Sequence, residues 1–217
     1  MEKSLYSLML MDDVVKAIDA LAFERNTNRS NLVNQILAEY VSMTTPEKRI
    51  DSIFRCIEEI LNRERTIVPY VPENAHTMQM KSSLEYKYRP TIKYEVELYR
   101  IPRGAIGELS VIFRTQSGSL ISAVNNFLSF WMKLEETYLS EYFPELPVEY
   151  KIKDGKFVWS IKLKEGRDYS AESVGDAISA YITNFDKYIK GWLTGRYTSE
   201  QIEKMYAAAL REGVGIL

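Results

Sequence analysis

The chain has 217 residues, a hydrophobic content of 46%, a charged content of 27% and a formal net charge of −2. These values are ordinary for a globular protein, and they exclude a chain that is drawn to nucleic acid or membrane by its overall charge. No apolar run reaches the roughly 18–20 residues of a membrane span, and Met1-Glu2-Lys3 leads straight into a patterned segment without a signal peptide, so we expect a cytoplasmic protein without a membrane partner.

The first expected element is a strand over residues 4–10, whose side chains alternate between two faces. One face carries Tyr6, Leu8 and Leu10, and the other carries Leu5, Ser7 and Met9. A helical pattern follows from Asp12 to about Glu24, and either Asp12 or Asp13 can cap it.

A polar turn over residues 26–30 then leads into a second helix that ends at about Val41. Either Asn28 or Ser30 can cap this helix, and its apolar residues recur at a spacing of three and four. Forty residues bury too little apolar surface to be stable alone, and a lone strand leaves its backbone groups unpaired. The segment therefore predicts an obligate dimer in which two copies pair strand to strand.

The spacing of these residues resembles the ribbon-helix-helix family, to which the Arc, MetJ and CopG repressors belong. Leu10 lies where the last inward strand residue is expected, and Arg29-Ser30 arrives at the family spacing. The matching inward positions of the two helices are Val14, Val15, Ile18, Leu21, Ala22, Leu32, Val33, Ile36, Leu37 and Tyr40. The resemblance covers about the first 42 residues without a gap.

The resemblance implies a homodimer that binds double-stranded DNA, with the paired strands in the major groove. The positions that it assigns to DNA are Lys3, Leu5, Ser7, Met9, Asn28, Arg29 and Ser30. The positions that it assigns to the dimer core are Tyr6, Leu8, Leu10, Ile18, Leu21, Leu32, Val33, Ile36 and Leu37. In the family, the start of the second helix holds a phosphate, and the arginine corresponding to Arg29 also serves structural roles.

Two properties of this segment depart from that expectation. Base readout normally uses Arg, Lys, Asn or Gln, whereas Leu5 and Met9 can only contact a thymine methyl or exclude water. Residues 1–45 also contain four basic and six acidic residues, a net charge of −2, so they neutralise few phosphates. Two interpretations stay open: a DNA-binding regulator, or a module used only for dimerisation or protein-partner binding, as in a plasmid, phage or antitoxin-like accessory protein.

The remainder of the chain predicts an α+β domain over residues 46–217. A helix over 46–65 connects it to residues 1–45 or extends the dimer contact, and residues 66–76 predict a loop or short extended piece. Strands are expected over 84–89, 91–100 and 109–113, and a hairpin over 148–163 turns at residues 154–155. Helices are expected from Ser117 or Ser119 to residue 139, over 171–193, and from Ser199 to residue 211. The sheet is mostly antiparallel, has about five strands and buries one face.

No constellation of residues supports an enzyme or a cofactor. Because the chain has one histidine, His76, and one cysteine, Cys56, a His/Cys metal cluster within one chain is impossible, and Cys56 is expected in a core. Basic and tyrosine residues alternate in the predicted sheet, either as a nucleic-acid platform or, as we favour, as a solvated face. This basic–tyrosine patch comprises Lys81, Lys87, Arg89, Lys93, Arg100, Arg103, Arg114, Tyr86, Tyr88, Tyr94 and Tyr99. The expected role of the α+β domain is therefore either oligomerisation beyond the dimer or effector sensing.

Overall fold

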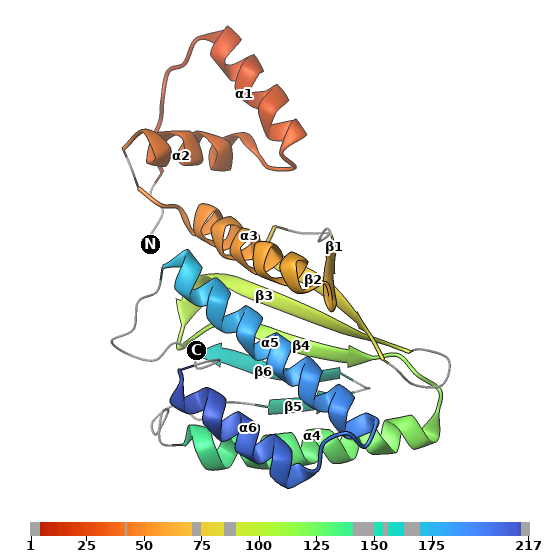
Figure 1. Ribbon diagram of the computed structural model, residues 1–217. Helices are drawn as coiled ribbons and strands as arrows, with labels where there is room; N and C mark the ends of the chain where they lie inside the picture. The colour runs from red at the N-terminus through yellow and green to blue at the C-terminus, as the bar shows by residue number, and fades with distance from the viewer. Residues whose placement is uncertain are drawn as a thin grey trace. The chain divides into compact units, whose positions relative to one another are not determined.

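The computed structural model describes residues 5–41, 43–70, 75–84, 90–140, 150–153, 156–162 and 170–213. The chain divides into two compact units, Met1–Arg49 and Ile50–Leu217, which we call the N-terminal and C-terminal units. The protein is α+β, with helices before and after a six-stranded antiparallel sheet (Figure 1). The predicted fold class is confirmed at this level.

The N-terminal unit contains α1 (Asp12–Glu24) and α2 (Arg29–Tyr40). Met11 is the N-cap of α1 and makes no side-chain cap, so the prediction that Asp12 or Asp13 caps this helix is wrong. Both carboxylates instead lie in the first turn, where they complement the helix dipole. Asn28 caps α2, because its side-chain oxygen accepts the N–H of Asn31 at 2.9 Å.

The expected strand over residues 4–10 is absent from the part that the structure describes, since residues 5–10 adopt neither helix nor strand. A ladder needs a partner for its backbone N–H and C=O groups, and the partner expected for this segment is a second chain. The strand over residues 4–10 is therefore expected to form only in the predicted dimer.

The C-terminal unit is built on a sheet with the strand order β1-β2-β3-β4-β6-β5. The strands are β1 (Ile67–Tyr70), β2 (Thr77–Ser83), β3 (Thr91–Arg103), β4 (Ala105–Phe113), β5 (Tyr150–Lys153) and β6 (Lys156–Lys162). β1 falls in the segment that was expected to be a loop or a short extended piece, and Pro69 is tolerated there because β1 is an edge strand. The expected strand at 84–89 lies outside the described residues except for Leu84, and so does the hairpin turn at 154–155.

One face of the sheet is buried and the other is polar, as the alternation in the sequence predicts. β3 alternates along its length, with Tyr94 and Val96 fully buried and Lys93 and Glu95 on the opposite face. The cross-strand partners of these buried residues, Met80, Val111 and Leu109, are buried as well. On the polar face Glu95 accepts a hydrogen bond from Gln79 and forms ion pairs with Lys93 and Lys156.

Four helices contribute side chains to the core beneath the buried face. They are α3 (Pro46–Glu64), α4 (Gly118–Leu139), α5 (Ala171–Leu193) and α6 (Ser199–Arg211). Figure 1 shows α5 running across the sheet, and its Asp186 reaches Tyr94 of β3. α3 packs so closely on α5 that a Cβ added at Gly175 would lie 2.7 Å from the Cβ of Cys56, which explains a small residue at each position.

The caps of the later helices differ in detail from the expectation. Ser117, one of the two expected caps, accepts the N–H of Leu120 and begins α4. α6 is capped by Thr198 and not by Ser199, because Thr198 and Gln201 form a reciprocal capping box. Ser170 caps α5 in the same way as Ser117 caps α4.

Candidate functional site

The candidate functional site is the N-terminal unit, where large apolar side chains are exposed in the single chain. Leu5 and Met9 are fully exposed, and Tyr6 is 82% exposed. The members of this open apolar surface are Leu5, Tyr6, Leu8, Met9, Leu10, Met11, Val14, Phe23, Ile36, Leu37, Tyr40, Val41 and Met43. Such a collection of apolar side chains on one small unit indicates an interaction surface.

The residues assigned to the dimer core fall into three groups. Leu32 is completely buried within the chain. Ile18, Leu21 and Val33 are half-buried. The remaining members are exposed, and they are Tyr6, Leu8, Leu10, Ile36 and Leu37. The single chain therefore supplies only part of a core, and the exposed members are those that a second copy would cover.

The start of α2 brings together the three residues assigned to phosphate binding. Asn28 caps the helix, and Arg29 and Ser30 are exposed in its first turn. The Arg29 guanidinium donates through Nε to Asp19 at 2.6 Å and through Nη2 at 2.5 Å, so it forms a bidentate pair that links α2 to α1. The hydrogen bond from Arg29 lowers the pKa of Asp19. The sequence analysis identified Arg29 but missed this partner.

The charges of the N-terminal unit provide little direct support for DNA binding. Lys16 lies 3.6 Å from Asp13, and Arg29 is engaged by Asp19. Lys3, the remaining base assigned to DNA, lies outside the described residues. On the segment before α1, Leu5, Ser7 and Met9 are exposed, but so are the inward residues that alternate with them. The single chain thus leaves both faces of the expected ribbon open.

The basic–tyrosine patch on the sheet does not form the platform considered above. Tyr94 lies on the buried face with no exposed surface, and its hydroxyl donates to Asp186 at 2.8 Å. Burial and the Glu108 carboxylate raise the pKa of Tyr99 to about 12. Lys93 is paired with Glu95. Lys87, Arg89, Tyr86 and Tyr88 lie outside the described residues, and among the described members Tyr94 belongs to the core and Lys93 has an acidic partner.

A buried carboxyl group that the sequence analysis missed lies in the C-terminal unit. Glu135 is 1% exposed and accepts hydrogen bonds from the hydroxyls of Tyr181 at 2.6 Å and Tyr150 at 2.7 Å. Desolvation raises the pKa of Glu135 to about 7, even though these hydrogen bonds favour the carboxylate. Tyr181 in turn accepts the indole N–H of Trp131, so the group is enclosed by aromatic side chains. Glu135 is therefore the centre of a buried hydrogen-bond network that joins α4, α5 and β5.

Searches for other kinds of site gave clear results within the described ranges. No three His, Cys, Asp or Glu side chains there come together as metal ligands. No helix of the described chain combines the length and apolar character needed to cross a bilayer. Comparisons with protein-family models, curated proteins and solved structures found no match to this chain. The functional conclusion therefore depends on the site itself and on the resemblance of residues 1–42.

Proposed function

We propose that the protein is a sequence-specific DNA-binding transcriptional regulator that acts as a homodimer through its N-terminal unit. The observation that carries the proposal is the open apolar surface of that unit, because seven of its members occupy positions that a ribbon-helix-helix dimer would bury. These are Tyr6, Leu8, Leu10, Val14, Ile36, Leu37 and Tyr40. In this dimer, residues 5–10 of two chains pair as a two-stranded ribbon, the shape that the major groove admits.

Dimerisation accounts for two features of the single chain at once. Exposed apolar side chains gain about 25 cal/mol for each Å² that a partner removes from water. The unpaired backbone groups of residues 5–10 gain hydrogen bonds when the ribbon forms. A second copy is the occupant that supplies both, because its own residues 5–10 have the same need.

The start of α2 supports contact with a phosphate. Helix N-termini present backbone N–H groups and a positive dipole end to an anion. The Asn28 side chain accepts a hydrogen bond from only one of these donors, the N–H of Asn31. Ser30 is exposed beside it and can donate a further hydrogen bond.

A second candidate function is assembly without DNA readout, in which the module serves only dimerisation or binding of a protein partner. Two observations favour it. The outward Leu5 and Met9 cannot form base-specific hydrogen bonds. Arg29 is already engaged by Asp19 in the single chain. In this alternative the protein still forms a homodimer but does not bind DNA.

The homodimer is tested by the mass of the full-length protein in solution, measured by sedimentation at micromolar concentration. Ile36→Glu places a charge on the open apolar surface and should yield monomers. Ile121→Glu on α4 is the matched control, because the two isoleucines are 43% and 44% exposed on helices of different units. A wild-type monomer, or equal effects of the two variants, would contradict the proposed interface.

The DNA function is tested by selecting bound fragments from a random pool and measuring their affinity for the full-length dimer across a salt series. A complex that neutralises phosphates weakens steeply as salt rises. Ser7→Ala and Met9→Ala should change which sequences are selected, because both positions face outward on the proposed ribbon. If no sequence is enriched and the dimer is intact, the assembly-only function replaces this one.

The role of Arg29 is resolved by comparing two variants that break the same ion pair. Arg29→Gln removes the cation, whereas Asp19→Asn removes the partner and leaves the cation free. If Arg29 contacts a phosphate, Arg29→Gln should weaken binding to all sequences and Asp19→Asn should not. Equal effects would show that Arg29 only joins α2 to α1.

A further inference from the structure

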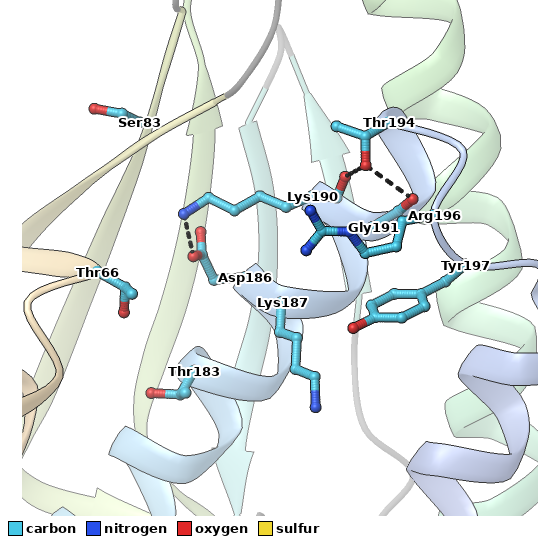
Figure 2. Close-up of a pocket in the computed structure, with 10 residues that line it drawn as sticks. All are labelled: Thr66, Ser83, Thr183, Asp186, Lys187, Lys190, Gly191, Thr194, Arg196 and Tyr197. Carbon is cyan, nitrogen blue, oxygen red and sulfur yellow. Dashed lines mark hydrogen bonds and ion pairs between the residues drawn. The ribbon is translucent and has the colours of Figure 1, made fainter.

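The C-terminal unit contains a pocket of about 320 Å³ between α5 and the strands β1 and β2 (Figure 2). Its lining comes from Thr66, Ser83, Thr183, Asp186, Lys187, Lys190, Gly191, Thr194, Arg196 and Tyr197. Three of these residues are basic and one is acidic. The volume lies at the small end of the range for small-molecule sites, which is about 300–1,000 Å³.

The single acidic residue of the pocket is already neutralised inside the protein. One oxygen of Asp186 accepts the Tyr94 hydroxyl at 2.8 Å, and the other lies 2.6 Å from Lys190 Nζ. Lys190 also donates to the Ser82 hydroxyl at 2.5 Å. Asp186 is 3% exposed and both of its oxygens are engaged, so its carboxylate is a buried support for the pocket wall.

The other two basic residues keep their charges for the pocket. Lys187 and Arg196 are exposed, and neither takes part in an ion pair or side-chain hydrogen bond with the rest of the described chain. Because Lys190 and Asp186 cancel, the lining has a net charge of +2 from Lys187 and Arg196. In Figure 2 the Lys187 side chain extends away from the Asp186–Lys190 pair.

The turn after α5 forms part of the pocket wall, and its hydrogen bonds occupy the carbonyl oxygens at the end of the helix. The last carbonyls of a helix normally disfavour anions. Here the Gly191 carbonyl accepts the N–H groups of Arg196 and Tyr197, and the Thr194 hydroxyl donates to the carbonyl of Lys190. Tyr197 packs directly on Gly191, since a Cβ there would lie 1.9 Å from its ring. The result is an aromatic wall beside two cations.

We propose that this pocket binds a small organic dianion, of the charge type shared by phosphate monoesters and dicarboxylates. Lys187 and Arg196 supply two positive charges, and Arg196 offers a fork that can bind either group through two hydrogen bonds. The hydroxyls of Thr66, Ser83 and Tyr197 supply further donors. The site lies wholly within the C-terminal unit, so it is independent of the proposed DNA-binding function.

The test is isothermal calorimetry on the full-length protein with glucose 6-phosphate, succinate, inorganic phosphate and uncharged glucose as probes. At least one organic dianion should bind, and glucose should not. Lys187→Gln and Arg196→Gln should each weaken that binding about tenfold, the effect of losing one charge-assisted hydrogen bond. Lys204→Gln on α6 is the control, because Lys204 is an exposed lysine outside the pocket.

Each other outcome overturns the proposal. Absence of binding by both organic dianions at millimolar concentration would show that the pocket is not an anion site. Equal binding of glucose would show that charge is not recognised. Equal affinity in Lys187→Gln, Arg196→Gln and Lys204→Gln would place the anion elsewhere on the protein. Binding of inorganic phosphate as tightly as the organic dianions would show that the pocket recognises no organic body.

Discussion

The two units of the chain differ in how completely each buries its apolar residues. In the N-terminal unit α1 buries only Ala22 and α2 only Leu32. In the C-terminal unit α5 alone buries ten of its 23 residues. Both units have amphipathic helices, so the difference lies in what their apolar faces meet. The apolar faces of the C-terminal helices meet a sheet within the same chain, whereas many apolar side chains of the N-terminal helices are exposed.

The largest expected effect comes from a substitution in the buried core of the C-terminal unit. Phe127 has no exposed surface and contacts the rings of Trp131, Phe185 and Trp192. Phe127→Ala should lower the free energy of unfolding of the C-terminal unit by about 3–5 kcal/mol, because it leaves a cavity. Urea unfolding followed by tryptophan fluorescence measures this. Ile121→Ala, on the exposed side of the same helix, should change stability by roughly 0.5 kcal/mol or less.

The second effect is a pH dependence confined to the C-terminal unit. The pKa of Glu135 in the folded protein is about 7, above its ordinary 4.5, so the folded state holds this proton more tightly than the unfolded state. The resulting stabilisation is complete below about pH 4.5 and is lost as pH rises through about 7, by about 3 kcal/mol in total. Tyr150 and Tyr181, which donate hydrogen bonds to Glu135, keep their protons over this range because burial raises the pKa of both phenols.

Urea titrations between pH 5 and pH 8 check this dependence. Glu135→Gln should remove most of the change with pH, because the amide does not titrate. Glu136→Gln, at the exposed neighbouring position, should keep it. A wild-type protein whose stability is flat over this interval would show that Glu135 does not change its protonation state there.

The third effect separates the units by their response to dilution. If a second copy completes the N-terminal unit, its stability depends on protein concentration by mass action. Tenfold dilution near the dissociation constant should lower the protection of α1 and α2 amides by about 1 kcal/mol, because the concentration of free monomer falls by somewhat less than tenfold. Hydrogen exchange of α5 amides should be unaffected, because α5 is buried within one chain. Equal responses in α2 and α5 would remove the distinction between the units.

The smallest effect concerns one helix cap in each unit. Thr198→Ala should lower the stability of the C-terminal unit by about 1 kcal/mol, because it removes the capping box with Gln201. Ser199→Ala, at the expected start of this helix, should have little effect, because Thr198 is the cap. Asn28→Ala should cost α2 a similar amount, and if the N-terminal unit is a dimer it should also weaken self-association. Thermal unfolding and sedimentation measure the two results.

Local patterns predicted most of the helices and central strands. The bounds of α1 and α5 follow from their apolar periodicity, and β3 follows from the alternation around Val96. That same alternation already placed Tyr94 on the buried face, so including it in a surface platform was wrong. The sequence left residues 66–76 open between a loop and a short extended piece, because Pro69 argues against a central strand, and only the sheet order shows that β1 lies at an edge.

The polar contacts that define the sites could not be predicted, because they join residues far apart in the sequence. Asp186 meets Tyr94 across 92 positions, and Glu135 meets Tyr181 across 46. Arg29 was found because family spacing marks it, but its partner Asp19 belongs to a different helix. Side-chain partners of this kind depend on the three-dimensional packing of the elements, which periodicity alone does not specify.

Pro69 has a consequence for how copies of this protein can join. It lies in β1, the outermost strand on one side of the sheet, and its nitrogen carries no hydrogen. An incoming strand would find a missing donor in the middle of a four-residue edge, so this border resists being lengthened by another molecule. Backbone pairing between copies is thereby disfavoured at that border, which lowers the risk that this edge of the C-terminal unit joins the sheet of a neighbouring molecule.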